Sequence, residues 1–180
     1  DRPGAAVPAE RLGGAVRFDE ISFAYRPDVP VLHILTLDVR PGERIALVGP
    51  SGAGKSTLLK LLMRFYDVRN GAIFLDGYDL RDLPLAFLRG QIGFVQQEPI
   101  LFNGTVRENI AYGDLDADQT RIEDAARAAR AHEFIDELPD GYDTWIGERG
   151  VKLSVGQKQR VSIARVLLKN PPLVVFDEAT

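Results

Sequence analysis

The stretch GPSGAGKST, Gly49 to Thr57, decides the fold of this chain. It follows the apolar run IALVG (Ile45 to Gly49), which is typical of a strand buried on both faces, and it opens a helical pattern from Lys55 to about Tyr66. Its three glycines allow successive N–H groups to point into one concavity that suits phosphate oxygens, and the helix start adds its positive dipole end. An ordinary glycine-rich turn is the alternative, but the strand–loop–helix context favours a phosphate loop.

A phosphate loop predicts roles for two of its own side chains and for an acidic pair near the end of the sequence. Lys55 is expected to reach the β- and γ-phosphates, and the Ser56 hydroxyl is expected to bind Mg²⁺. A nucleotide-bound Mg²⁺ needs a carboxylate at the tip of a nearby strand, and Asp177 directly follows the apolar run LVVF. Glu178 is then placed to polarise the attacking water. A surface turn is the alternative interpretation of this Asp-Glu pair.

Composition bounds the class of protein. The chain has 180 residues, of which 45% are hydrophobic and 27% charged, as in a globular domain. A net charge of −4 argues against a nucleic-acid-binding face, and the lack of cysteine excludes disulfides and thiolate metal sites. No apolar run approaches the ~20 residues that cross a bilayer, so we expect this segment itself to be soluble.

The pattern along the chain predicts an α/β organisation. Residues 1–14 are rich in Pro, Ala and Gly and are interpreted as a linker from a preceding region. Strands are expected in AVRFDEISFAY, VLHILTLDV, IALVG, AIFLDG, IGFV and LVVF. Helices are expected between Thr105 and about Leu138 and from Ser154 to near Leu168. This alternation predicts a largely parallel sheet with a helical insert.

The stretch LSVGQKQR, Leu153 to Arg160, narrows the choice among phosphate-loop proteins. Ser154 and Gln157 form a capping-box pattern, and Gly156 keeps the backbone open at the mouth of a helix. Such a helix start is itself an anion site. From these residues alone, a well-capped helix without a ligand is the favoured interpretation.

Together these motifs resemble the nucleotide-binding domain of exporter-type ATP-binding cassette (ABC) transporters, over nearly the whole chain from about Val16 to Thr180. GPSGAGKST resembles the Walker A motif of the family, LSVGQ its signature and LVVFDE its Walker B with the catalytic glutamate. The resemblance implies a P-loop NTPase (RecA-like) core over residues 15–180, with an N-terminal antiparallel β subdomain and an inserted α-helical subdomain at about 98–165. It also implies that the C-terminal part of the core is missing.

The resemblance assigns further site residues. Tyr25 resembles the aromatic residue that stacks on adenine, although a plain strand tyrosine is the alternative. Gln97 resembles the glutamine that contacts Mg²⁺ and the attacking water; Gln96 is the adjacent rival. GERG, 147–150, resembles a loop that signals to the membrane domains, or is a charged turn. The resemblance implies ATP contacts from Tyr25, Gly49, Pro50, Ser51, Gly52, Ala53, Gly54, Lys55, Ser56, Thr57, Gln97, Ser154, Gly156 and Gln157, with Ser56, Gln97 and Asp177 on the metal and Glu178, Lys55 and Gln97 in catalysis.

The family mechanism implies two partners. Two such domains are expected to pair head-to-tail around two ATP molecules, with the signature helix of each acting on the γ-phosphate held by the other. Hydrolysis is expected to power transport through transmembrane domains of the same polypeptide, at the cytoplasmic face of a cell membrane. The transported substrate is not encoded here.

Two departures from the family pattern matter. Val155 stands where the usual signature LSGGQ has its first glycine; it weakens the site if the position needs a positive φ and merely adds bulk if φ is negative. The D-loop and the switch histidine of the family come after the Asp-Glu pair, where this sequence has no equivalent, and His33 and His132 do not replace that histidine. We therefore expect a portion of a longer protein that folds poorly and lacks steady ATPase activity by itself.

Two other classes compete with the exporter interpretation. An ABC-type ATPase of DNA repair or chromosome structure would place long coiled coils between the loop and the signature, and no heptad run occurs there. A non-hydrolysing ATP-gated binding module would explain Val155 but not the retained Glu178.

Overall fold

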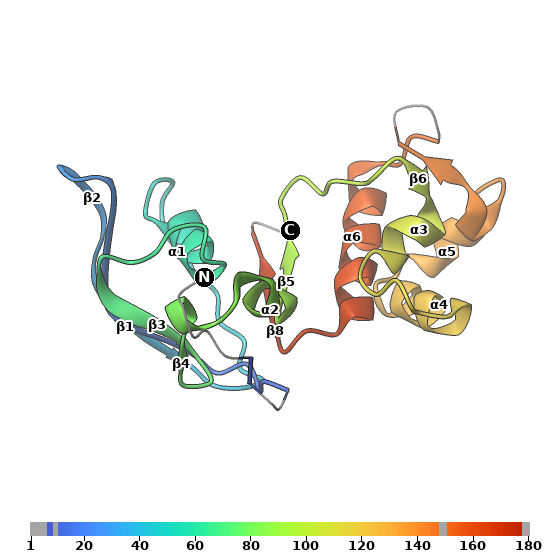
Figure 1. The fold of residues 1–180 in the computed structure, drawn as a ribbon. Coiled ribbons are helices and arrows are strands. Elements are labelled where there is room, and N and C mark those ends of the chain that lie inside the picture. Colours follow the sequence, from blue (N-terminus) through green and yellow to red (C-terminus); the bar gives the residue numbers. More distant parts are fainter. Residues whose placement is uncertain (1–6, 9–10, 148–150, 178–180) are drawn as a thin grey trace. The chain divides into compact units, whose positions relative to one another are not determined.

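The computed structural model describes residues 7–8, 11–147 and 151–177, which divide into two compact units at Ile92 and Gly93 (Figure 1). A four-stranded sheet of order β2-β1-β3-β4 forms the framework of the first unit. Its members are β1 (Val16–Arg26), β2 (Val29–Val39), β3 (Asn70–Leu75) and β4 (Tyr78–Asp79), and each neighbouring pair is antiparallel. The N-terminal antiparallel β region is therefore confirmed. The expected parallel arrangement is wrong for this sheet, because hairpins rather than helical crossovers connect most of its neighbouring strands.

The alternation of buried and exposed residues in strand β1 shifts by one residue in the middle of the strand. Val16 and Phe18 are buried, and so are Ile21 and Phe23, which breaks a strict alternation. The register shifts between Phe18 and Ile21, and Glu20 there has a left-handed φ of 48°. One extra residue in the strand thus lets both halves of β1 face the same core.

The end of the predicted linker belongs to the first unit. Leu12 is buried, and the backbone N–H groups of Gly13, Gly14 and Ala15 all donate to the carboxylate of Asp76, at 2.6, 3.0 and 2.9 Å. The N–H of Asp76 returns a bond of 2.8 Å to the Ala15 carbonyl. These charge-assisted bonds tie residues 12–15 to the sheet.

The run IALVG does not form the predicted strand. Residues 43–50 adopt no regular structure, and every residue from 41 to 50 is exposed, including Val48 at 89%. A strand exists only through hydrogen bonds to a neighbour, and within the described part of the chain no strand pairs with this run. The apolar pattern is present in the sequence, but the partner that would make it a buried strand is not among the described residues.

The helix after the loop, α1, covers Lys55–Leu62 instead of running to about Tyr66. It ends because Arg64 adopts a left-handed φ of 52°. The N–H of Arg64 donates to the Leu61 carbonyl and the next N–H donates to the Lys60 carbonyl, both at 2.9 Å. This pair of bonds is a Schellman motif, in which the left-handed position is usually glycine. After β4 the first unit continues with the 3₁₀ turn η1 (Leu80–Asp82) and helix α2 (Leu85–Gly90).

The second unit is mainly helical, as the sequence predicts. Helix α6 (Val155–Lys169) packs on α3 (Val106–Ala111) and α4 (Gln119–Ala128), and α5 (His132–Asp136) packs on α4. A short ladder of β6 (Gly104–Thr105) with β7 (Trp145–Ile146) and the 3₁₀ turn η2 (Gly141–Asp143) complete this part. Its core is one apolar cluster that includes Val106, Ile110, Ile122, Ala126, Ile135, Ile146, Val161 and Ala164.

Strands β5 (Ile92–Val95) and β8 (Leu173–Phe176) pair side by side (Figure 1). The N–H of Asp177 donates to the Val95 carbonyl at 3.0 Å, so the carboxyl ends of both strands lie at the same end of the ribbon. That is the arrangement of parallel strands, and the expected parallel pairing is found at this place. Among the helices of the described residues, none combines the length and the apolar character needed to span a bilayer.

Candidate nucleotide-binding site

The phosphate loop enters α1 through a left-handed glycine. Gly54 has φ 90° and ψ 4°, and α1 starts at the next residue with no hydrogen bond from a capping side chain. A Cβ on Gly54 would lie 2.7 Å from Cδ2 of Leu32 and 3.4 Å from the carbonyl oxygen of Val31. The position therefore requires glycine twice, for its backbone angle and for the close approach of β2. The first N–H groups of α1 are left to a ligand that approaches the loop.

Lys55 lies across this loop. Its ammonium group donates to the carbonyl oxygens of Gly49 at 2.7 Å and Pro50 at 3.0 Å. Residues 50–53, which form the outer part of the loop, are all exposed, and the Ala53 N–H donates back to Pro50 at 3.2 Å. A positive charge is thus held at the mouth of a backbone concavity, which is the electrostatic arrangement that phosphate oxygens require.

The two hydroxyl residues after Lys55 lie in different surroundings. Ser56 is exposed, so its oxygen is available to a metal ion. Thr57 is 7% exposed, and its Oγ1 lies 3.2 Å from the hydroxyl of Tyr25. The structure therefore brings together two predicted site residues, Tyr25 and Thr57, that are 32 positions apart in the sequence.

Tyr25 is part of a group of three aromatic rings. Its ring centroid lies 5.0 Å from that of Phe23 and 5.2 Å from that of Tyr66, in edge-to-face geometry in both cases. Phe23 and Tyr66 are 5.7 Å apart, and the ammonium group of Lys60 lies 6.0 Å from the Tyr25 centroid. Tyr25 remains 44% exposed, so an accessible ring is present beside the loop helix.

The start of α6 has the predicted capping box. The hydroxyl of Ser154 accepts from the Gln157 N–H at 3.3 Å, and the side chain of Gln157 accepts from the Ser154 N–H at 2.8 Å. Val155 is the first residue of the helix, has no positive φ and is 71% exposed. Of the two alternatives for Val155, the structure supports the one in which the valine only adds bulk.

Gly156 has no packing reason within the described residues to be glycine. A Cβ added there would meet no atom within 4 Å, and its φ is not positive. Glycine inside a helix costs about 0.5–1 kcal/mol relative to alanine. The open space beside Gly156 therefore suits the close approach of a group from outside this chain.

Gln97 and Asp177 follow two paired strands at the same end. Gln97 comes shortly after β5 and is exposed, and Asp177 directly follows β8 and is half-buried. An amide oxygen, a carboxylate and the Ser56 hydroxyl are all oxygen donors, the type that Mg²⁺ prefers. Glu178 and residues 148–150 of GERG lie outside the described residues, so their predicted roles stay predictions.

Sequence reasoning missed Phe23, Lys60 and Tyr66 as neighbours of Tyr25. The sequence pattern extends the loop helix to about Tyr66, whereas the helix ends at Leu62 and Tyr66 lies beyond the turn at Arg64. The only sequence signal was the presence of aromatic residues near both motifs, and such residues are more often ordinary core residues.

The family follows from comparison with known proteins. A family model described as ABC transporter matches residues 32–180. This chain belongs to the ABC transporter family. The ABC domain is 55% identical over 181 residues to a putative multidrug export ATP-binding/permease protein, YgaD, of Bacillus subtilis, and covers 31% of that protein. It is 50% identical to the mitochondrial iron-sulfur clusters transporter ATM1 of Chaetomium globosum and covers 30% of it.

A solved structure of a bacterial Atm1-family ABC exporter with ATP bound matches the whole ABC domain with a TM-score of 0.93 and 49% identity. The domain covers 31% of that chain, so it spans about a third of the length of the relatives it matches. The P-loop NTPase fold with an antiparallel N-terminal sheet is thereby confirmed, and so is the likeness to the ATP-binding domain of ABC exporters.

Proposed function

We propose that this domain binds Mg-ATP and hydrolyses it to power an exporter whose membrane-spanning part lies elsewhere in the same polypeptide. The observation that carries the proposal is the start of α1, where a left-handed glycine, an absent side-chain cap and the Lys55 ammonium group together form an anion site. Relatives named as exporters, one of them with ATP bound, support the same conclusion. The domain would then lie at the cytoplasmic face of a cell membrane.

The predicted residues divide the work of binding between the base, the phosphates and the metal. The loop from Gly49 to Thr57 holds the phosphates, Lys55 neutralises the charge on the β- and γ-phosphates, and Tyr25 stacks on adenine. The oxygens of Ser56, Gln97 and Asp177 would hold Mg²⁺, which supplies positive charge to the transferring phosphoryl group. The exposure of Ser56 and Gln97 and the position of Asp177 after β8 support this donor set.

Glu178 acts as the general base in the proposed reaction. It accepts a proton from water as the water oxygen forms a bond to the γ-phosphorus, and the bond from that phosphorus to the bridging oxygen of ADP breaks. General-base help is typically worth ~10²–10⁴-fold in rate. The products are ADP and inorganic phosphate, and no other reactant is required.

The start of α6 serves a second copy of the domain. Its capping box satisfies the Ser154 and Gln157 N–H groups internally, while Val155 and Gly156 are exposed. We therefore propose that Ser154, Gly156 and Gln157 contact the γ-phosphate bound to the partner domain in a head-to-tail pair. Closure of the pair then requires ATP rather than ADP, because ADP lacks the group that this helix start would contact.

The test compares the full-length protein with its Glu178→Gln variant in the presence of Mg-ATP. The parent should release phosphate continuously, and the variant should lose ~10²–10⁴-fold in turnover while it accumulates an ATP-bound closed pair, measured by cross-linking or size. Glu133→Gln, which alters an exposed carboxylate on α5, is the matched control and should match the parent. An active Glu178→Gln variant, or an inactive parent that still binds ATP, would contradict the proposal and favour the non-hydrolysing module.

A further inference from the structure

A turn that follows the loop helix contacts the side chain predicted to stack on the base. Helix α1 carries Lys55 at its first residue, and Tyr66 follows its C-terminal turn. Tyr25 contacts this segment at two points: its hydroxyl lies 3.2 Å from Oγ1 of Thr57, and its ring centroid lies 5.2 Å from that of Tyr66. The α1 segment therefore contacts both the hydroxyl end and the ring of Tyr25.

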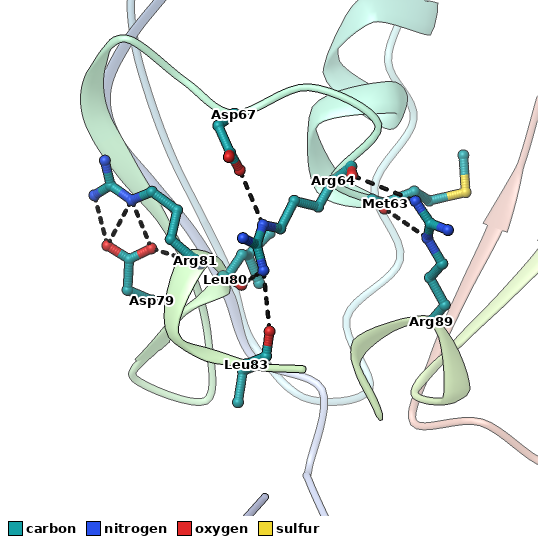
Figure 2. Close-up of polar contacts among 8 residues, drawn as sticks. All are labelled: Met63, Arg64, Asp67, Asp79, Leu80, Arg81, Leu83 and Arg89. Carbon is teal, nitrogen blue, oxygen red and sulfur yellow. Dashed lines mark hydrogen bonds and ion pairs between the residues drawn. The ribbon is translucent and has the colours of Figure 1, made fainter. Parts of the chain in front are cut away.

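The turn that places Tyr66 is held by two arginines (Figure 2). Arg64 keeps a left-handed backbone, which costs a non-glycine residue free energy, and its side chain is only 10% exposed. Its guanidinium group donates to the carbonyl oxygens of Leu80 and Leu83, each at 3.0 Å, and to Asp67 at 2.9 Å. These three bonds compensate for the strained backbone and explain why arginine is found where glycine is usual.

Arg89 on α2 also contacts this turn. It donates to the Met63 carbonyl at 3.3 Å (Figure 2). Its guanidinium group also lies 4.9 Å from the ring centroid of Phe65. Arg89 thus adds contacts from α2 to a turn whose N–H groups are already bonded to carbonyl oxygens of α1. The backbone that leads into Tyr66 is therefore fixed from two elements.

We propose that Tyr66 is a positioning residue that orients the ring of Tyr25 for the nucleotide base; this rests on the proposed base-stacking role of Tyr25. Tyr25 is near the end of β1 and is 44% exposed, so by itself its ring would have to be ordered when ATP binds. Edge-to-face contacts with Tyr66 and Phe23 fix the ring plane beforehand, while the side chain stays accessible to the base. Preorganisation of this kind increases affinity because less entropy is lost on binding.

Tyr66 is expected to affect binding of the base but not of the phosphates, so the test compares a ligand that has the base with one that lacks it. Equilibrium binding of Mg-ATP and of Mg-tripolyphosphate, which has the phosphates without the base, is measured on the full-length protein. Tyr66→Leu should weaken ATP about 2- to 10-fold, the range expected when one aromatic pair is lost, and should leave tripolyphosphate affinity unchanged. Tyr66→Phe keeps the ring and should restore the affinity of the parent.

Two further variants make the outcome decisive. Tyr78→Leu removes another half-exposed tyrosine of the same unit and should leave both affinities unchanged. Tyr25→Ala should weaken ATP at least as much as Tyr66→Leu. If Tyr25→Ala weakens ATP and Tyr66→Leu does not, or if Tyr66→Leu weakens both ligands equally, only the positioning role is overturned. If Tyr25→Ala has no effect, the base-stacking role itself fails, and the positioning role fails with it.

Discussion

The starts of α1 and α6 are two solutions to one problem, the unpaired N–H groups at the beginning of a helix. Helix α1 begins after a left-handed Gly54 with no capping side chain, so its N–H groups depend on a ligand. Helix α6 begins with a complete capping box between Ser154 and Gln157. The first start lacks a side-chain cap and suits an anion, whereas the second is capped by its own side chains.

Gly54 and Gly156, which lie at these two helix starts, differ in a similar way. Gly54 is required by the chain itself, because its φ is positive and Leu32 lies against it. Gly156 is required by nothing that the structure describes, because the space beside it is open. A glycine that serves folding and a glycine that serves an external contact can therefore be distinguished by mutation.

The largest effect is expected from Gly54→Ala. An L side chain at φ 90° costs about 1–3 kcal/mol in backbone strain, and the methyl group of Leu32 that would lie 2.7 Å from the new Cβ must also shift. ATP binding by the full-length protein should be lost. Gly42→Ala is the control, because Gly42 has φ 74° but no neighbour within 4 Å of a Cβ, so it reports backbone strain without crowding. Normal ATP affinity in Gly54→Ala would show that α1 does not hold the phosphates.

Gly156→Ala should separate stability from activity. Alanine should stabilise α6 by about 0.5–1 kcal/mol, because helical glycine is unfavourable and no clash arises. ATPase activity should nevertheless fall, on the order of 100-fold if the methyl group displaces a backbone donor from the partner's phosphate. Thermal unfolding and phosphate release are measured on the same sample. Unchanged activity would leave α6 as a well-capped helix without a ligand.

Ser154→Ala should moderately lower both the stability of the protein and its ATPase activity. Loss of the cap costs about 0.5–2 kcal/mol of unfolding free energy. Thr105 and Glu108 form the same box at the start of α3, so Thr105→Ala should cause a similar loss of stability. Only Ser154→Ala should also lower the ATPase activity of the folded protein. Equal activity in the two variants would mean that the Ser154 hydroxyl serves the helix alone.

The smallest effect is expected from Val155→Gly, which restores the usual signature of the family. Val155 is already helical and exposed, so glycine relieves no strain and costs about 0.5 kcal/mol of helix propensity. ATP turnover should therefore change little. A large gain in turnover would show that the valine methyl groups obstruct the partner's phosphate.

Local motifs were predictable because their physical causes are local. The phosphate loop follows from glycine spacing, and the capping box of α6 follows from two side chains three residues apart. The end of α1 was predicted too late, because Arg64 gave no sign of a left-handed turn that is stabilised by Leu80 and Leu83. The shift in the burial pattern of β1 at Glu20 was equally unpredictable from the sequence, because a bulge depends on the neighbouring strands.

The amino-acid sequence by itself determined the family, the phosphate loop and the signature helix, because each of these motifs depends on residues that are close in the chain. Only the tertiary structure decided which residues surround Tyr25. It also decided that the run from Ile45 to Gly49 pairs with no strand among the described residues. The physical reason is that strand pairing and ring packing depend on partners many residues away, and the pattern of one segment does not specify its partner.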